Sequence, residues 1–240
     1  MSAPDSDRAR VVRENLDRVR RRITDACAEA GRDPEEVTLI VVTKFFPVSD
    51  LRILADLGVR HIGENRHQEA VEKADQTRDL DLTWHFVGNL QSNKAAAVAA
   101  YADVVESVDR PKLVGALSRG AHEHDRVVDC LVQVNLDPPA GVSGTGRGGA
   151  DPADVLPLAE RLTQAGGLRL RGVMTVAPPD QDPAPAFRRL AEIARAVREL
   201  DPGATWISAG MSADLEAAVK ASATHVRIGS AVLGRRAQIK

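Results

Sequence analysis

The amino-acid sequence predicts a single (β/α)8 barrel, and three observations support this prediction. Eight strand-like apolar runs alternate with helical runs along the whole chain. The chain has 240 residues, close to the roughly 250 that such a barrel needs. No linker interrupts the alternation, so a division into two domains is not indicated. We therefore expect residues 1–7 to form a flexible N-terminus and residues 8–240 to form one barrel domain.

The elements follow one another in a regular order. Val12, Leu16, Val19 and Ile23 recur at helical spacing, so residues 8–30 predict an additional N-terminal helix that ends before Gly31. β-Branched runs without polar alternation are typical of parallel strands covered on both faces. The predicted strands are residues 37–44, 59–63, 82–88, 103–108, 127–136, 168–176, 205–209 and 224–229, and the predicted helices between them are residues 49–57, 65–78, 92–101, 111–122, 152–165, 184–200 and 213–221.

A doubly wound open sheet is the alternative architecture, because periodicity does not reveal whether a parallel sheet closes on itself. In either fold, functional groups gather where strands end and loops begin. The ends of the predicted strands are therefore the places to search for a site.

Composition and charge exclude several classes of function. The chain carries 32 Lys and Arg against 34 Asp and Glu, a net charge of −2, with 3% aromatic residues, so neither a nucleic acid nor a membrane is an expected partner. No apolar run approaches the ~20 residues of a membrane helix, and residues 1–7 lack the apolar stretch of a signal peptide. A cytoplasmic location is expected. Cys27 and Cys130 lack metal-ligand spacing and are expected to be buried small hydrophobes.

Lys44 is the only one of the six lysines that closes a predicted strand. Desolvation at the mouth of a barrel favours a neutral amine, which is the nucleophile that imine formation requires. A lysine that merely extends its charge from a strand end into water is the alternative interpretation. Lys44 is thus a candidate nucleophile whose interpretation depends on the rest of the mouth.

Two glycine-containing turns follow the last two predicted strands, in residues 207–214 and 226–234. Gly210 and Gly229 allow close backbone approach to a ligand, and Ser212 can cap the following helix. These loops are the recurrent phosphate site of barrels, although Gly and Ser also make ordinary turns. Arg227 lies inside the last strand and is expected to face the mouth, where it meets a ligand or a carboxylate.

Two polar stretches complete the predicted mouth. Glu64, Asn65 and Arg66 follow the second strand, and His85 lies within the third, although a lone strand histidine is more often a satisfied core residue than a catalytic one. The GTGRGG run at residues 144–149 fits a dinucleotide-binding pattern but lacks its strand and acidic context, so we expect a flexible surface loop. The histidines at positions 122 and 124 lack a third ligand nearby, and no metal site is expected.

Seven motifs resemble those of the YggS/PROSC family of pyridoxal-phosphate homeostasis proteins across nearly the whole chain after the first helix. They are TK (43–44), GENRHQE (63–69), WHFVGNLQSNK (84–94), VQVNL (132–136), LRGVMTV (170–176), GMSADLEAA (210–218) and VRIGSAVLGRR (226–236). The resemblance implies a TIM barrel like the N-terminal domain of alanine racemase, holding pyridoxal 5′-phosphate (PLP) as an imine.

The resemblance also implies roles for individual residues. Lys44 matches the imine-forming lysine, and Arg227 matches the arginine that faces the pyridine nitrogen. The implied phosphate contacts are Ser212, Gly229 and Ser230, with Ser208 as a further candidate, and Asn65 and His85 match positions lining the cofactor.

The implied function is reversible binding, buffering and delivery of PLP to PLP-dependent enzymes, by a monomer that also meets other B6 vitamers. Catalysis is not expected, because the further domain and the tyrosine base of alanine racemase have no match here; Tyr101, the only tyrosine, lies at the end of a predicted helix. A small PLP-dependent amino-acid racemase or lyase is the alternative. A lysine-imine aldolase is a third hypothesis, but its lysine usually lies on strand six, which here ends in Met174, Thr175 and Val176.

Overall fold

The computed structural model describes residues 3–137 and 148–234, and its strands close into a parallel barrel in chain order. Pairing of the first and last strands, with Val41 opposite Ile228, completes the ring. The barrel is thereby confirmed, and the open doubly wound sheet is wrong. The strands are β1 (Thr38–Val42), β2 (His61–Glu64), β3 (Thr83–Phe86), β4 (Val104–Val108), β5 (Val128–Gln133), β6 (Leu168–Met174), β7 (Trp206–Ser208) and β8 (His225–Ile228).

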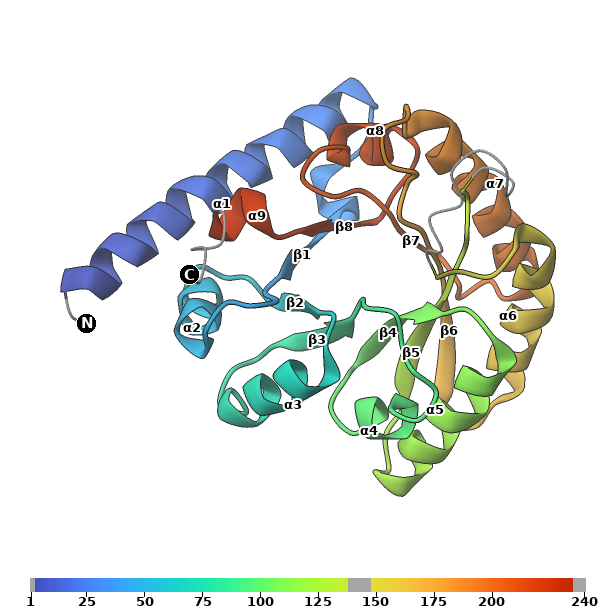
Figure 1. Cartoon of the computed structure of the whole chain (residues 1–240). Coiled ribbons are helices and arrows are strands. Elements are labelled where there is room, and N and C mark those ends of the chain that lie inside the picture. Colours follow the sequence, from blue (N-terminus) through green and yellow to red (C-terminus); the bar gives the residue numbers. More distant parts are fainter. Residues whose placement is uncertain (1–2, 138–147, 235–240) are drawn as a thin grey trace.

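Helices surround the barrel (Figure 1). They are α1 (Ala3–Glu29), α2 (Val48–Asp56), α3 (His67–Gln76), α4 (Ala95–Ala99), α5 (Pro111–Glu123), α6 (Val155–Gln164), α7 (Ala184–Leu200), α8 (Leu215–Lys220) and α9 (Ser230–Leu233), with short 3₁₀ turns at Pro34–Glu36 and Pro152–Asp154. Helix α1 begins at Ala3, five residues before the predicted start, so residues 3–7 are helical. Their predicted flexibility stays a prediction, as does the division into residues 1–7 and 8–240.

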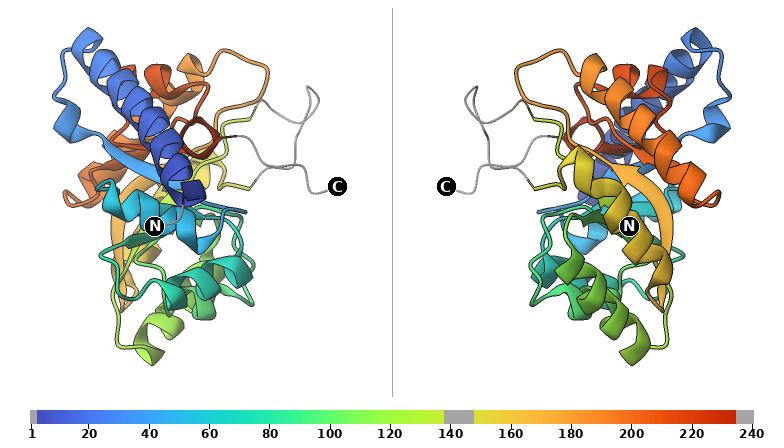
Figure 2. Two further views of the ribbon diagram at one scale, coloured as in Figure 1. Left: turned by 90° about the vertical axis from the view of Figure 1, so that its left-hand side faces the viewer. Right: turned by 90° about the vertical axis from the view of Figure 1, so that its right-hand side faces the viewer.

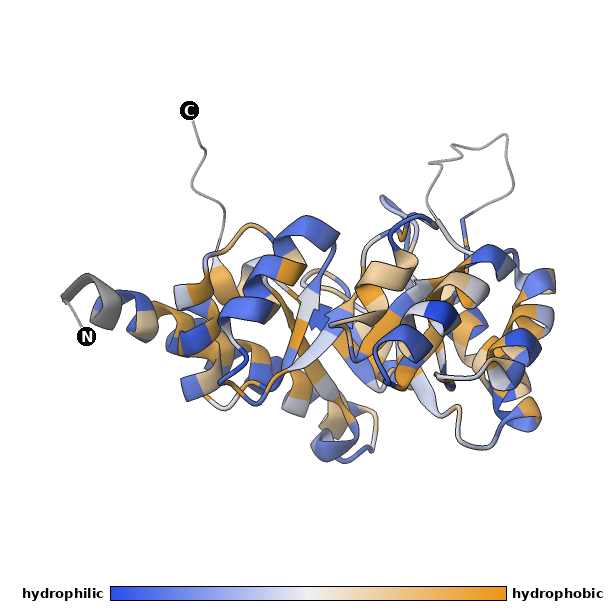
Figure 3. Ribbon diagram, turned by 90° about the horizontal axis from the view of Figure 1, so that it is seen from below, coloured by the Kyte–Doolittle hydropathy of each residue, from blue (hydrophilic) through white to orange (hydrophobic). Residues whose placement is uncertain are grey.

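The apolar stripe predicted for the N-terminal helix packs against the barrel. Val12, Leu16 and Cys27 have no exposed surface and join one cluster with residues of β1, β8 and α9. Figure 2 shows α1 on one side of the barrel and α6 and α7 on the opposite side. The helices around the barrel carry both hydrophobic and hydrophilic residues (Figure 3). Cys27 and Cys130 are both buried and free, as predicted.

Helix α1 also contacts the loops at the mouth of the barrel. Arg22 forms an ion pair with Glu216 and donates to the backbone oxygen of Ser212 at 3.0 Å. Asn15 donates to the backbone oxygen of Val232 at 3.0 Å. The additional helix therefore supports both turns in which the sequence predicts a phosphate site.

Some predicted features fall outside the part of the chain that the structure describes. Most of the GTGRGG run, residues 144–147, lies there, so its interpretation as a flexible surface loop stays a prediction. Among the described residues, no helix combines the length and apolar character needed to cross a membrane. The same residues contain no group of three or more His, Cys, Asp or Glu side chains arranged to hold a metal ion.

Candidate functional site

Lys44 lies in a tight turn just beyond β1. The strand ends at Val42, and the amide of Phe46 donates to the carbonyl of Thr43 at 3.0 Å to close the turn. The side chain of Lys44 is exposed, so the predicted desolvation of this amine is wrong for this structure. The reason is geometric, because the turn carries Lys44 past the end of the strand rather than leaving it between strands.

One cavity of about 240 Å³ brings Lys44 together with the start of α9. This arrangement follows from barrel closure, since β1 and β8 are hydrogen-bonded neighbours and their C-terminal ends meet at the mouth. Lys44 and a glycine–serine turn thus line the same cavity. The lining residues are Val42, Lys44, Phe45, Phe46, Gly229, Ser230 and Gly234.

The turn after β7 requires glycine, and the turn after β8 leaves little room for a larger residue at Gly229. A Cβ on Gly210 would lie 2.6 Å from the Cβ of Ala218, and Gly210 has a φ of +92°, which favours glycine. A Cβ on Gly229 would lie 3.1 Å from the carbonyl oxygen of Val42. The backbone of β8 can therefore approach β1 closely at the rim. Ser212 lies in the β7 turn and does not line the cavity beside Lys44.

Arg227 is buried in the barrel on the mouth side. Its guanidinium donates to the hydroxyl of Ser208 at 2.6 Å and to the carbonyl of Thr175 at 2.7 Å. It also lies 3.8 Å from a carboxylate oxygen of Glu106. Burial lowers the pKa of Arg227, and the charge of Glu106 opposes that effect. The predicted encounter of Arg227 with a carboxylate is thus confirmed.

A chain of polar side chains continues from Arg227 through the barrel interior. Glu106 accepts from Ser208 at 2.6 Å, and its other oxygen lies 2.9 Å from Nδ1 of His85. Nε2 of His85 lies 3.0 Å from Nδ1 of His61. Because β4 is adjacent to neither β7 nor β8, these contacts must cross the interior. We call Arg227, Ser208, Glu106, His85 and His61 the interior chain.

The interior chain keeps a carboxylate ionised at the centre of the barrel. Burial alone would raise the pKa of Glu106, but hydrogen bonding to His85 and the charge of Arg227 outweigh burial and lower it to about 2. Burial and His85 lower the pKa of His61 to about 4. His85 and Ser208 are buried members of this chain, and neither lines the cavity beside Lys44.

Asn65 lines a different rim cavity of about 360 Å³, between the loops after β2 and β3. Its Oδ1 is buried and makes no hydrogen bond in the structure. The described structure therefore divides the predicted site residues among four places. Lys44, Gly229 and Ser230 share one cavity, Arg227, Ser208 and His85 share the interior chain, and Asn65 and Ser212 lie on separate rim loops.

The sequence analysis did not identify two further functional candidates, Glu106 and Lys73. Glu106 is a lone acid within an apolar strand, the same signal that singled out Arg227, so it could have been found. The β4–β5 pairing shifts register between Val105 and Val108, and such a bulge re-aims the side chain between them. Lys73 lies on a predicted helix, where a charge normally indicates a solvated face, yet its side chain is only 7% exposed.

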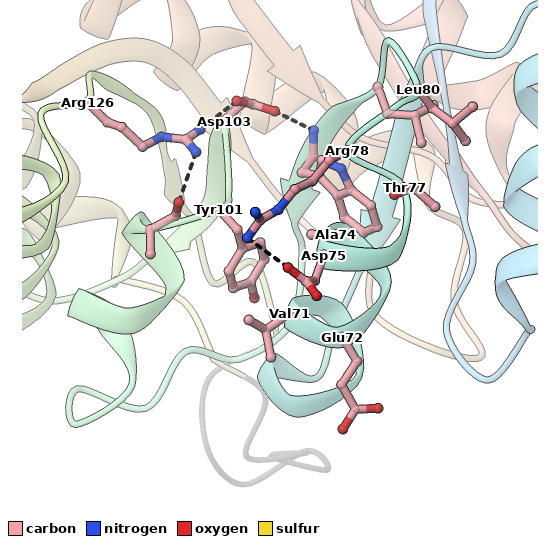
Figure 4. A pocket seen from close by; sticks show the side chains of 13 residues that line it. Val71, Glu72, Ala74, Asp75, Thr77, Arg78, Leu80, Tyr101, Asp103 and Arg126 are labelled. Atoms are coloured by element: carbon pink, nitrogen blue, oxygen red, sulfur yellow. Dashed lines mark hydrogen bonds and ion pairs between the residues drawn. The ribbon is translucent and has the colours of Figure 1, made fainter.

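A larger cavity, of about 600 Å³, lies outside the barrel between α3 and the segment after α4 (Figure 4). Its charged groups are largely paired with one another, as in Arg78 with Asp75 and Arg126 with Asp103. Tyr101 lines this cavity, and its buried hydroxyl makes no hydrogen bond. Because no lysine lines it, this cavity cannot supply the amine that imine chemistry requires.

Comparison with known proteins identifies relatives along nearly the whole chain. Residues 12–237 match the family model for the alanine racemase N-terminal domain. The pyridoxal phosphate homeostasis protein of Mycobacterium tuberculosis is 39% identical over 250 residues, covering 96% of this chain and 95% of that protein. The protein of the same name from Escherichia coli K12 is 34% identical over 231 residues, covering 94% and 97%.

Solved structures agree with this result. PipY of Synechococcus elongatus, solved with PLP bound, matches with a TM-score of 0.80 and 34% identity, covering 93% of this chain and all of that one. An alanine racemase from Clostridium difficile matches with a TM-score of 0.70 at 16% identity, covering 95% of this chain and 58% of that one. The second match shows a shared fold only.

Proposed function

We propose that this chain, which belongs to the family of pyridoxal phosphate homeostasis proteins, binds PLP reversibly through a covalent imine on Lys44 and so buffers the free cofactor. The observation that carries the proposal is the single cavity lined by Lys44, Gly229 and Ser230. PLP supplies an aldehyde that reacts reversibly with a primary amine and a phosphate that binds to backbone and hydroxyl donors. PipY, a relative at 34% identity, is solved with PLP bound.

The residues beside Lys44 suit this cofactor in their chemistry, because an amine lies next to a turn with backbone and hydroxyl donors. Gly229 lacks a Cβ where one would crowd Val42, so the turn after β8 can lie close to the end of β1 beside Lys44. We assign Gly229, Ser230 and Ser212 to the phosphate, with Ser208 as a further candidate. Arg227 is assigned to the pyridine nitrogen, where a cation disfavours protonation of the ring and weakens it as an electron sink. Asn65 and His85 are assigned to the surroundings of the cofactor.

The proposed role is that of a carrier rather than an enzyme. Racemisation needs two bases on opposite faces of the substrate. Lys44 is the one ionisable side chain among the described residues that line the cavity, so no second base lies beside it there. The partners of the proposed carrier are PLP, other B6 vitamers and recipient PLP-dependent enzymes. Its effect on amino- and keto-acid balance is indirect. We propose a cytoplasmic monomer.

Borohydride trapping tests the proposal directly. Purified protein mixed with PLP should develop a visible imine absorbance, and reduction followed by peptide mapping should place the label on Lys44. The Lys44→Ala variant should show neither signal. A label on another lysine, or no label on the wild type, would reject the proposal.

An amino-acid racemase or lyase is the second candidate function, and the alanine racemase-like fold favours it. Steady turnover of a panel of L- and D-amino acids that disappears in Lys44→Ala would support this enzyme over the carrier. The absence of such turnover would favour the carrier over the enzyme.

A further inference from the structure

A buried cluster of charged groups lies directly behind the turn that carries Lys44. Lys73 on α3 is its centre, and its ammonium donates to the carbonyl of Thr43 at 2.8 Å, to Glu64 at 2.7 Å and to Glu69 at 2.6 Å. The hydroxyl of Thr43 donates to the same oxygen of Glu64 at 2.6 Å. We call Thr43, Glu64, Glu69 and Lys73 the outer cluster, because it lies between the barrel wall and α3.

The ammonium group of Lys73 has as many hydrogen-bond acceptors around it as it has protons. An ammonium group has three protons, and three acceptors receive them: the carbonyl just after β1 and carboxylates on β2 and α3. The side chains of Lys73 and Glu64 are 7% and 1% exposed, so water does not compete strongly for these bonds. Such a charge is retained inside a protein only when its partners are fixed. The cluster therefore joins the end of β1 rigidly to α3.

Both residues that flank Lys44 are held by this cluster. On one side, the carbonyl of Thr43 accepts from Lys73. On the other side, the amide of Phe45 donates to the Glu69 carboxylate oxygen that also accepts from Lys73. Phe45 has a φ of +69°, a left-handed conformation that costs a non-glycine residue about 1 to 2 kcal/mol. A hydrogen bond that offsets this cost selects the turn over a relaxed loop.

We propose that Glu69 and Lys73 are positioning residues that hold the Lys44 turn in the conformation from which its amine bonds to the PLP aldehyde. This inference rests on the proposed function of Lys44. Neither residue lines the cavity beside Lys44, so each acts through the backbone of the turn and not through the cofactor. Lys44 itself is exposed, and the turn is the part of the chain that limits where its amine can reach.

The test separates the covalent bond from the rest of binding by comparing two ligands. PLP carries the aldehyde, whereas pyridoxine 5′-phosphate carries the same ring and phosphate without it. Glu69→Ala should weaken PLP affinity at least about tenfold, because misplacing a reacting group is costly. The same variant should change pyridoxine 5′-phosphate affinity by no more than about twofold. Imine absorbance gives the first affinity, and calorimetry gives the second.

Two further variants complete the design. Glu69→Gln keeps an oxygen acceptor for the amide of Phe45, so PLP affinity should stay within about threefold of the wild type. Glu72→Ala removes an exposed acid from the same helix and should leave both affinities unchanged. Glu69 is preferred over Lys73 for substitution because its side chain is 23% exposed and the variant should fold.

Each outcome decides between the two ideas. Unchanged PLP affinity in Glu69→Ala overturns the positioning role, and so does an equal loss for both ligands, which would indicate a general structural effect. Failure of the wild type to form a trappable imine on Lys44 would instead overturn the proposed function.

Discussion

The interior chain and the outer cluster are two buried polar networks on opposite faces of the barrel wall. Arg227 and Glu106 are 4% and 1% exposed inside the barrel, and Lys73 and Glu64 are 7% and 1% exposed outside it. The interior chain joins side chains from strands that are distant in sequence. The outer cluster joins α3 to the end of β1, and through that strand end it holds the turn of Lys44.

The two networks hold different parts of the molecule in place. The interior chain fixes a cation within the rigid ring of strands, where few movements are available. The outer cluster fixes a turn at the rim, where the backbone would otherwise have several conformations. We therefore expect removal of a charged group from the interior chain to appear mainly as lost stability, and removal of Glu69, which holds the turn of Lys44, to appear mainly as altered binding.

The largest expected effect comes from removing the interior carboxylate. Glu106→Leu leaves the Arg227 guanidinium buried without its counter-charge, which should lower the free energy of unfolding by about 3 to 5 kcal/mol. Urea unfolding followed by circular dichroism measures this loss. The matched surface control is Glu192→Gln, whose carboxylate is 51% exposed and pairs with Arg189, and it should cost about 0.5 kcal/mol or less.

A double variant separates the charge from the packing. Replacing both partners, as in Glu106→Leu with Arg227→Met, removes the unpaired charge and should recover at least about half of the lost stability. If the double variant is as unstable as the sum of the two single ones, the pair is not electrostatically coupled, and the interior chain is only a packing feature.

The two networks should respond to acid with opposite signs. Burial lowers the pKa of His61, a member of the interior chain, to about 4, so between pH 6.5 and 4 the unfolded chain binds more protons at this residue than the folded chain does. The free energy of unfolding should therefore fall as the pH decreases, with a slope below the value of about 1.4 kcal/mol per pH unit for a fully buried histidine, because His61 is partly exposed and solvent screens its charge. Burial raises the pKa of Glu64, so acidification through that range favours the folded state at this residue.

Urea titrations at pH 6.5, 5.5 and 4.5 measure these slopes. His61→Gln should make the loss of stability on acidification shallower, and Glu64→Gln should make it steeper. Equal slopes in the wild type and both variants would show that neither network controls the acid response.

The order of strands and helices could be predicted from the sequence, because it depends on local apolar patterns. The apolar runs that became β1 and β8 are readable without tertiary information, and barrel closure then makes their ends neighbours. The meeting of Lys44 with Gly229 and Ser230 follows from that adjacency. Once the strand order is known and the barrel is closed, this part of the site can therefore be predicted.

What the sequence could not supply depends on contacts between distant residues. Lys73 looks like an exposed helix charge, because its partners Thr43 and Glu64 are 30 and 9 residues away. The exposure of Lys44 was also missed, since strand periodicity does not show that β1 stops at Val42. The hydroxyl of Ser208 bonds inside the barrel to Glu106 and Arg227, and the sequence around residue 208 does not indicate these contacts.

The smallest expected effect is Thr43→Val, which removes one hydroxyl from the outer cluster. The variant loses the 2.6 Å hydrogen bond to Glu64, while Lys73 still bonds to that carboxylate and to the backbone carbonyl at position 43. A hydrogen bond to a charged group is worth about 1.5 kcal/mol or somewhat more, so the free energy of unfolding should fall by about that amount. Because Lys73 and Glu69 still hold both sides of the turn, PLP affinity should change far less than in Glu69→Ala. A loss of stability as large as that of Glu106→Leu would mean that the outer cluster supports the fold as much as the interior chain does, and the contrast between the two networks would then be lost.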